Sequence, residues 1–274
     1  MISIIVPAYN EKNTIEDTIK TLRDYFNSQG ERYELVVVSD GSVDRTYDVA
    51  KELEDDYVRV FSYQNNQGKG HALKYGFGKS QGDQIVFFDA GLDFPPEQIT
   101  DFLGLLNSNG ADMIIGSKRH PDSTVSYPWH RRLVSFAAQT LVRLLFNLNV
   151  TDTQVGIKAF RREVLEKIMP LVLVKRYAFD IELLALAHHY GYSIMEAPVK
   201  LDLKISTAVS PRSLKNCLLD TLAVFYRLKI LGYYDLSYED RQEMLDKYPV
   251  TTVDKVASFI LGDLLTRKQS EETS

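Results

Sequence analysis

The sequence predicts an α/β fold in which helices cover both faces of a mostly parallel sheet. Short, continuous runs of Val, Ile and Phe alternate with segments of helical spacing between residues 2 and 115. Strands that are apolar throughout belong to sheets that are buried on both faces, and such sheets are mostly parallel. In addition, a polar motif directly follows each of three of these runs. Ligands bind beyond the carboxyl ends of the strands in sheets of this kind.

The expected strands are apolar runs bounded by turn-forming or polar residues. They cover residues 2–6, 34–38, 58–63, 85–88 and 113–115. The first helix opens at Asn13 and Thr14 and carries two acids in its first turn, where the helix dipole favours them. The helices that follow in this region are expected at residues 44–54, 69–80 and 99–107.

The pattern changes after residue 118. Further helices are expected at residues 129–147, 164–169, 179–190 and 214–230, and a strand at residues 193–203. The tail carries segments 238–248 and 253–265, the latter amphipathic, and its polar end is expected to fray. We therefore predict a main domain over residues 1–210, followed over residues 211–274 by C-terminal amphipathic or interface helices and a polar tail.

Composition excludes several classes of protein. Hydrophobic residues make up 45% of the 274 residues and charged residues 25%, which is typical of a well-cored globular protein. The net charge of −5 argues against general nucleic-acid binding. Cys217 is the only cysteine, which excludes an intrachain disulfide and a cysteine-rich zinc site and indicates a reducing compartment. No charge-free run approaches the roughly 18 residues of a membrane span, so we expect a soluble or peripheral protein.

Two polar motifs follow the first two strands. In SDGS, the glycine after Asp40 permits a tight turn that would expose the Asp40 carboxylate to a ribose or a base. The alternative is a helix cap by Ser42 or Asp44, and both roles can hold at once. PAYNE places Tyr9 and Glu11 at the mouth of the first strand, where a plain capped loop explains the motif equally well.

The third motif, FFDAGLDFPPE, puts Asp89 at the end of a buried aromatic strand, where a carboxylate must be paired, solvated or metal-bound. A metal site would commonly have a second acid two residues later, but Gly91 stands there and the next acid is Asp93. The carboxylates of Asp40, Asp89 and Asp93 around one cleft suit a hard cation such as Mg²⁺ or Mn²⁺. Neither GxxxxGK[ST] nor GxGxxG is present, which disfavours a P-loop NTPase and a dinucleotide dehydrogenase.

A later helix carries further ionisable residues. His188 and His189 lie in the mostly apolar string ELLALAHHYG, far from the strand-end motifs, and we interpret them as ordinary helix residues. Asp180 and Glu182 either face the ligand cleft or cap and solvate the helix. The motif match described next favours the cleft.

Seven strings stand in the order found in the family-two glycosyltransferases with the GT-A fold. They are PAYNE, VVVSDGSVDRT, NQGKGHALKYGF, VFFDAGLD, IIGSKR, TDTQVGIKAF and YAFDIELL. Over roughly residues 2–230 the chain resembles the dolichyl-phosphate sugar synthases of this family. DTQVGIKAF together with FDIELL is more similar to the glucosyl-type synthases, which use UDP-sugars, than to the mannosyl type, which uses GDP-mannose.

The resemblance implies a role for each matching residue. Those that would bind the nucleotide sugar are Pro7, Tyr9, Glu11, Val38, Asp40, Asp89, Ala90 and Lys118. Asp89 and Asp93 would hold Mg²⁺ or Mn²⁺, whereas Gly91 stands where the family usually has its second metal-binding Asp. Arg131 and Lys204 match cations that would hold a lipid phosphate, and with Asp89 and Asp93 they form the expected catalytic set.

The implied reaction moves a sugar with inversion from a nucleotide sugar to a polyprenyl or dolichyl phosphate. A general base is not strictly needed, because the acceptor phosphate is already anionic and nucleophilic. Three alternatives stay open. The chain could be a transferase for a soluble or glycan acceptor, or a nucleotidyltransferase. It could also be a non-catalytic protein that binds a nucleotide sugar, since Gly91 removes an expected metal ligand. The nucleotidyltransferase is disfavoured because its Gly-rich phosphate loop is absent.

A membrane surface is a further expected partner. Trp129 and the basic residues after it precede the broad apolar face of the predicted helix at 129–147, which fits an element lying among lipid headgroups. The predicted helix at 214–230 is a second candidate, and the alternative is that both helices only cover the sheet. We expect peripheral attachment to the cytoplasmic face of a membrane and no nucleic-acid partner. An oligomer is left open.

Overall fold

The computed structural model describes residues 1–108, 110–125, 129–201 and 211–247, and for residues 129–137, 211 and 245–247 the backbone alone. Internal contacts divide the chain into two compact units, Met1–Thr207 and Ala208–Ser274. The first unit contains the sheet. That residues 1–210 and 211–274 act as separate domains stays a prediction.

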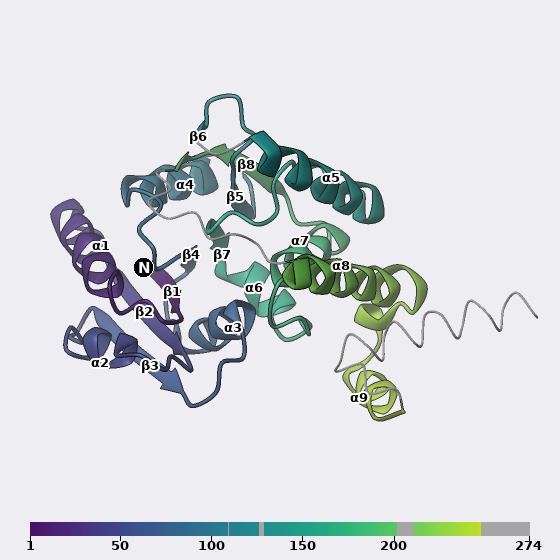
Figure 1. The fold of residues 1–274 in the computed structure, drawn as a ribbon, viewed down its shortest axis with the longest axis horizontal. Coiled ribbons are helices and arrows are strands. Elements are labelled where there is room, and N and C mark those ends of the chain that lie inside the picture. Colours follow the sequence, from purple (N-terminus) through teal and green to yellow (C-terminus); the bar gives the residue numbers. More distant parts are fainter. Residues whose placement is uncertain (109, 126–128, 202–210, 248–274) are drawn as a thin grey trace, which may run out of the picture. The chain divides into compact units, whose positions relative to one another are not determined.

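A seven-stranded sheet in the order β3-β2-β1-β4-β7-β5-β8 forms the centre of the first unit (Figure 1). Its strands are β1 (Ile2–Ala8), β2 (Tyr33–Asp40), β3 (Val58–Tyr63), β4 (Gln84–Phe88), β5 (Met113–Ser117), β7 (Ile157–Arg161) and β8 (Ile194–Pro198). All neighbours are parallel except β7, which runs antiparallel to both β4 and β5. The short strands β6 (Thr124–Val125) and β9 (Lys200–Leu201) form a separate parallel pair.

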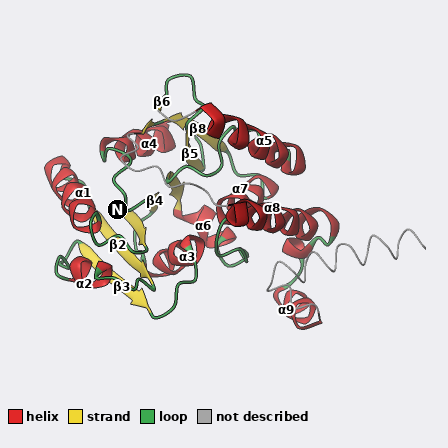
Figure 2. Ribbon diagram, in the orientation of Figure 1, coloured by secondary structure: helices red, strands yellow, loops and turns green. Residues whose placement is uncertain are grey.

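Helices cover both faces of this sheet, as Figure 2 shows. The helices α1 (Ile15–Gln29), α2 (Thr46–Lys51) and α4 (Glu97–Ser108) share a hydrophobic core with one face. The helices α3 (Lys69–Lys79), α6 (Arg162–Ile168) and α7 (Phe179–His189) lie on the other. The remaining helix of this unit is α5 (Trp129–Phe146). The predicted α/β class with a mostly parallel sheet is confirmed.

Close packing fixes the position of α3. A Cβ added at Gly76 would lie 2.5 Å from Ile5 Cγ2 of β1, so only glycine allows the helix to approach the sheet this closely. At the other end of α3, a Cβ added at Gly70 would lie 2.4 Å from the ring of Phe179. One part of α3 is therefore packed closely against the sheet at Gly76, and its first turn is packed against the start of α7 at Gly70.

The second unit contains α8 (Pro211–Phe225), a π-helical turn at Tyr226–Ile230, a 3₁₀ turn at Tyr233–Asp235 and α9 (Tyr238–Lys247). Arg227 Nε donates to the Tyr234 hydroxyl at 2.9 Å within it. The segment 253–265 lies outside the described residues. Across the described ranges, no helix combines the length and the apolar character needed to cross a bilayer.

Two sequence predictions need correction. β7 was not expected, because Lys158 interrupts its apolar residues and removes the continuous run that marks the other strands. The strand expected at residues 193–203 is two strands, β8 and β9, within its described part. The main-sheet pairing ends at Pro198, which has no N–H to donate, and the next N–H, that of Val199, donates to Ser123 Oγ at 2.8 Å.

Candidate functional site

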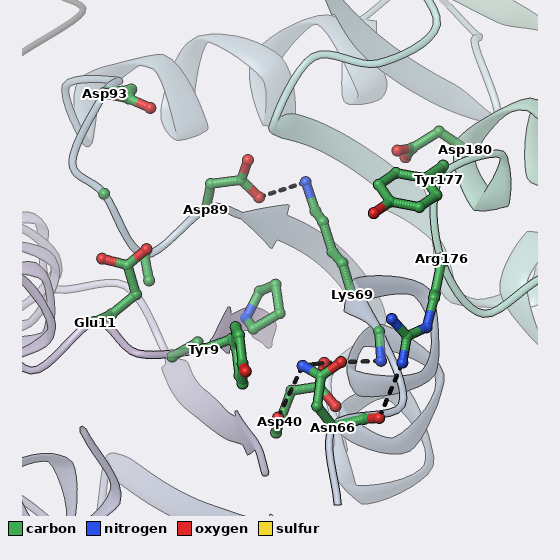
Figure 3. A pocket seen from close by; sticks show the side chains of 15 residues that line it. Tyr9, Glu11, Asp40, Asn66, Lys69, Asp89, Asp93, Arg176, Tyr177 and Asp180 are labelled. Carbon is green, nitrogen blue, oxygen red and sulfur yellow. Dashed lines mark hydrogen bonds and ion pairs between the residues drawn. The ribbon is translucent and has the colours of Figure 1, made fainter. Parts of the chain in front are cut away.

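A cavity of about 570 Å³ lies at the carboxyl ends of β1, β2 and β4. Its lining comes from PAYNE, SDGS, the start of α3, DAGLD and the segment that leads into α7 (Figure 3). The three polar motifs therefore meet at one edge of the sheet, as the parallel order of their strands requires. Of the predicted site residues, those that line the cavity are Pro7, Tyr9, Glu11, Asp40, Asp89, Ala90 and Asp93.

Four predicted site residues are not part of this lining. Val38 is fully buried and pairs with Pro7 in the sheet, so its side chain lies behind the lining. That it borders a nucleotide stays a prediction. Lys118 follows β5, and its ammonium lies 3.5 Å from Asp152. Arg131 lies in α5 with only its backbone described, and Lys204 lies outside the described residues.

The Asp40 carboxylate organises the turn that leads into α3. Its Oδ1 accepts from the Tyr63 hydroxyl and the Gln67 N–H, both at 2.8 Å. Its Oδ2 accepts from Asn66 Nδ2 and the Gly68 N–H, both at 2.9 Å. A carboxylate offers about four acceptor positions, so these four donors saturate it. Asp40 therefore shapes the cavity wall by fixing the segment that carries Asn66 and Gly68.

The expectation that the turn exposes the Asp40 carboxylate is wrong, because the residue is only 3% exposed. Gly41 is nevertheless required: its φ is 61°, and an added Cβ would lie 2.3 Å from the Asn66 nitrogen. Burial, together with the hydrogen bond to Asp40 and its negative charge, raises the pKa of Tyr63, which stays a neutral donor. The capping alternative holds in part, because Asp44 Oδ1 accepts the Thr46 N–H at 2.9 Å.

Side-chain hydrogen bonds join the loop after β1 to the loop after β2. The N–H of Glu11 donates to Thr46 Oγ1 at 2.8 Å, and that of Asn10 donates to Ser42 Oγ at 3.2 Å. Asn10 has a φ of 57°, a left-handed conformation that asparagine tolerates. The joined loops present Tyr9 at the cavity with 46% of its surface exposed.

Asp89 lies between a glycine and a lysine. Its Oδ1 is 2.6 Å from Lys69 Nζ, and both side chains are about one third exposed, at 35% and 38%. Its backbone N–H donates to the Gly156 carbonyl at 3.2 Å. A Cβ at Gly156 would lie 2.2 Å from Asp89 Oδ2, so glycine at this position leaves room for the carboxylate.

Two carboxylates act on Lys69. Burial alone would lower the pKa of its ammonium, but the negative charges of Asp89 and Asp180 outweigh burial and raise it. Lys69 therefore stays protonated at neutral pH. Figure 3 shows Lys69 reaching to Asp89, while Asp93 lies apart from this pair.

The two acids of FDIELL have different roles. Asp180 lines the cavity and pairs with the buried Lys158, whose Nζ lies 2.8 Å from its Oδ1. Glu182 is fully buried, and its Oε2 accepts the N–H groups of Leu173 and Val174 at 2.9 and 2.7 Å. The interpretation that this motif faces the cleft fits Asp180, whereas Glu182 anchors the preceding segment. His188 and His189 are exposed at the end of α7, away from the lining.

The anchored segment brings Arg176 and Tyr177 to the cavity, two residues that the sequence did not single out. Arg176 Nη2 donates to the Asn66 carbonyl at 3.2 Å. The Lys175 carbonyl accepts the N–H of Gly70 at 2.9 Å. The segment before α7 is thus bonded to the start of α3. Both segments were noted in the sequence as the motifs NQGKG and YAFDIELL. Their separation along the chain did not show that the two segments are in contact.

The cavity lining carries a net negative charge, so an anionic ligand is expected to bind together with a cation. Its charged side chains are five carboxylates and two cations, Lys69 and Arg176. Across the described residues, no group of three or more Asp, Glu, His or Cys forms a ready metal cage. Mg²⁺ uses one or two carboxylates together with substrate phosphates and water. The carboxylates of Asp89 and Asp93 in one loop fit that mode of binding.

The backbone conformation and packing at position 91 do not require glycine. Its φ lies outside the left-handed region, and the nearest atoms to an added Cβ all belong to Asp93, the closest at 3.5 Å. A side chain therefore fits here without backbone strain. An added Cβ would be in ordinary van der Waals contact with the Asp93 carboxylate.

Comparison with known proteins identifies the family. Residues 3–169 match the family described as Glycosyl transferase family 2. The chain belongs to this family. It has the GT-A fold, and the predicted resemblance is confirmed. Glucosyl-3-phosphoglycerate synthase of Mycobacterium tuberculosis, solved with Mn²⁺, UDP and phosphoglyceric acid, matches with a TM-score of 0.65 and 22% identity over 82% of this chain and 77% of that one.

Relatives with higher identity include three named proteins. Glycosyltransferase AglD of Haloferax volcanii is 32% identical over 76% of this chain, which spans 34% of AglD. Polyprenol monophosphomannose synthase of Mycolicibacterium smegmatis is 34% identical over 72% of the chain and 75% of the relative. Human dolichyl-phosphate beta-glucosyltransferase is 33% identical over 72% of the chain and 66% of the relative.

The hydrogen bonds of Asp40 give a stability prediction. Asp40→Asn keeps the side-chain shape but turns an acceptor oxygen into an NH₂ group that faces buried donors. An unsatisfied buried group costs roughly 1–3 kcal/mol, so the free energy of unfolding in urea should fall by about that amount. Asp48→Asn, at an exposed position of α2, is the control and should change it by less than about 0.5 kcal/mol. An Asp40→Asn protein as stable as its parent would contradict the role of this carboxylate.

Proposed function

We propose that the chain transfers a sugar with inversion from a nucleotide sugar to a polyprenyl or dolichyl phosphate. The observation that carries the proposal is the acidic cavity in which PAYNE, SDGS and DAGLD meet. The names of two relatives support the acceptor class: one is a polyprenol monophosphomannose synthase and the other a dolichyl-phosphate beta-glucosyltransferase. A UDP-sugar is the favoured donor because the motif strings resemble the glucosyl-type synthases, and GDP-mannose is the second candidate.

The nucleoside would occupy the end of the cavity formed by Pro7, Tyr9 and Glu11. The exposed Tyr9 ring offers a surface on which a base can stack. The hydrogen bonds that Asp40 accepts within the protein leave it no free acceptor position for the nucleoside. It would instead hold in place the segment of Asn66 and Gly68, which lines the cavity. Asp89 and Ala90 would lie at the ribose and the diphosphate.

Asp89 and Asp93 would hold a divalent cation at the diphosphate. Bound Mg²⁺ or Mn²⁺ would offset the charge that develops on the leaving nucleoside diphosphate. Lys69 would contribute a second positive charge from the start of α3, next to Asp89. Lys118 keeps its proposed place near the donor, although Asp152 pairs with it and it lies outside the cavity lining.

Arg131 and Lys204 would bind the acceptor phosphate and align it for attack on the anomeric carbon. The planar guanidinium of arginine can bind two phosphate oxygens at once. The acceptor needs no general base because its attacking oxygen is already an anion. The task of these residues is therefore to orient the acceptor and to offset its charge.

The proposal is tested by incubating the protein with Mg²⁺, polyprenyl phosphate and either UDP-glucose or GDP-mannose. A lipid-linked sugar identified by mass spectrometry supports it. A water-soluble product would indicate the alternative acceptor class. Binding of a nucleotide sugar without turnover would indicate a non-catalytic binding protein.

The DAGLD loop gives a prediction for metal dependence. Asp93→Ala should nearly abolish metal-dependent turnover, because it removes one of two proposed ligands. Gly91→Asp should keep or raise turnover and tighten the binding of Mn²⁺ measured by titration, because the added carboxylate would lie beside Asp93. Gly91→Ala is the matched control and should behave like the parent, since an added Cβ meets no atom closer than 3.5 Å. Full activity in EDTA, or an undiminished Asp93→Ala enzyme, would show that the loop binds no metal.

The acceptor residues give a second prediction of this function. Arg131→Ala and Lys204→Ala should each lower turnover at subsaturating lipid phosphate by about one to two decades, the effect of losing a charge-assisted contact of roughly 1.5–3 kcal/mol. Affinity for the nucleotide should not change. Arg143→Ala, at an exposed position of the same helix α5, is the control for Arg131. Unreduced activity of Arg131→Ala under these conditions would refute its assignment.

Membrane attachment gives a third prediction. We propose that the chain attaches peripherally to the cytoplasmic face of a membrane, and the exposed side chains of Leu141 and Leu144 on α5, 37% and 78% exposed, support this. The protein should co-sediment with anionic vesicles at low salt and less at high salt, because salt screens the basic residues. Absence of co-sedimentation at low salt would count decisively against attachment.

A further inference from the structure

Lys158 is a charged residue at the centre of the sheet. It lies in the middle of β7, opposite Phe87 of β4 and Ile115 of β5, and is only 2% exposed. Removing an ammonium group from water costs several kcal/mol unless an anion and further acceptors compensate it. A lysine at this position therefore needs a built-in partner.

That partner is Asp180. Lys158 Nζ lies 2.8 Å from Asp180 Oδ1 and donates a second hydrogen bond to the Val155 carbonyl at 2.5 Å. Because β7 is hydrogen-bonded to a strand on each side, the backbone of Lys158 is fixed in position, and its side chain extends from there to Asp180. Asp180 lies in the first turn of α7, where the helix dipole also favours a negative charge. The ion pair with Lys158 thus holds the Asp180 carboxylate in one orientation.

Asp180 also faces the cavity. Its side chain is 12% exposed and forms part of the lining, and no described residue donates a hydrogen bond to its Oδ2. One oxygen of the carboxylate is therefore committed to Lys158, and the other can accept hydrogen bonds from a ligand. An oxygen presented in this way suits hydroxyl groups, which donate.

The neighbouring residues indicate which part of a donor would reach Asp180. The proposed nucleoside end lies at Tyr9 and Asn66, and the proposed diphosphate end lies at Asp89 and Lys69. Figure 3 shows Asp180 on the far side of Lys69 from Asp89. A phosphate would be repelled by the Asp180 carboxylate, whereas the sugar beyond the diphosphate is neutral and rich in hydroxyls.

We propose that Asp180 accepts hydrogen bonds from hydroxyls of the transferred sugar and that Lys158 is the positioning residue that holds Asp180 in place for this contact. This inference rests on the proposed function. It gives the buried lysine of GIKAF and the aspartate of FDIELL a joint role in recognising the sugar.

The experiment compares each nucleotide sugar with its own nucleotide. Dissociation constants for UDP-glucose and UDP, and for GDP-mannose and GDP, are measured by calorimetry with Mn²⁺, and the pair that binds the parent more tightly is used. In Lys158→Met and Asp180→Asn, the ratio of the sugar nucleotide's Kd to the nucleotide's Kd should rise about tenfold or more, as expected for a lost hydrogen bond to a charged group. The nucleotide's own Kd should stay unchanged, and Lys158→Arg should restore part of the ratio.

Lys74→Met is the matched control. Lys74 is a partly buried lysine of α3 that donates to the Val172 carbonyl at 3.0 Å and does not line the cavity, so its loss should leave the ratio unchanged. If Lys158→Met fails to fold in a thermal melt, Asp180→Asn, which is nearly the same shape, carries the test.

An unchanged ratio in Asp180→Asn, or an equal loss of affinity for nucleotide and nucleotide sugar, would overturn the inference. A parent protein that binds none of the four probes would overturn the proposed function and this inference with it. The two failures are therefore distinguished by the parent protein alone.

Discussion

The pairing register of β7 is the constraint on which the cavity depends. Ile157 lies opposite Phe88 and Lys158 opposite Phe87, which places Gly156 directly against Asp89. Successive strand residues point to opposite faces, so a slip of one residue would move Lys158 to the other face of the sheet and away from α7. The same register leaves room for the Asp89 carboxylate and supplies the counter-ion of Asp180. One antiparallel strand thus positions acids from two different segments.

The charges of the cavity are arranged in pairs from the sheet interior outwards. Lys158 forms an ion pair with Asp180, and Lys69 forms an ion pair with Asp89. The negative charge of Asp180 also attracts Lys69. Buried or partly buried charges of this kind are costly when one partner is lost. The pairs hold the carboxylates in defined positions before any ligand arrives, which is what a site for charge-rich substrates requires.

Much of the fold could be predicted because parallel, fully buried strands appear as continuous apolar runs. β1 to β5 were found in this way, and the polar motifs at three of their ends indicated the site. β7 was missed because Lys158 breaks its apolar pattern, and the pairing that makes Lys158 acceptable is long-range. The Asp40 carboxylate was expected to be exposed because the glycine turn is visible in the sequence, whereas its four donors are not. Arg176 and Tyr177 were missed for the same reason, since their position depends on Glu182 and on contacts with α3.

The central claim is that this acidic cavity binds a nucleoside diphosphate together with a divalent cation. It is tested most directly by titrating UDP and GDP into the protein calorimetrically, once with Mn²⁺ and once with EDTA. The account predicts saturable binding of one nucleotide with Mn²⁺ and much weaker binding in EDTA, because five carboxylates in the lining repel an uncompensated diphosphate. Equal affinity in EDTA, or no binding of either nucleotide with Mn²⁺, would contradict it.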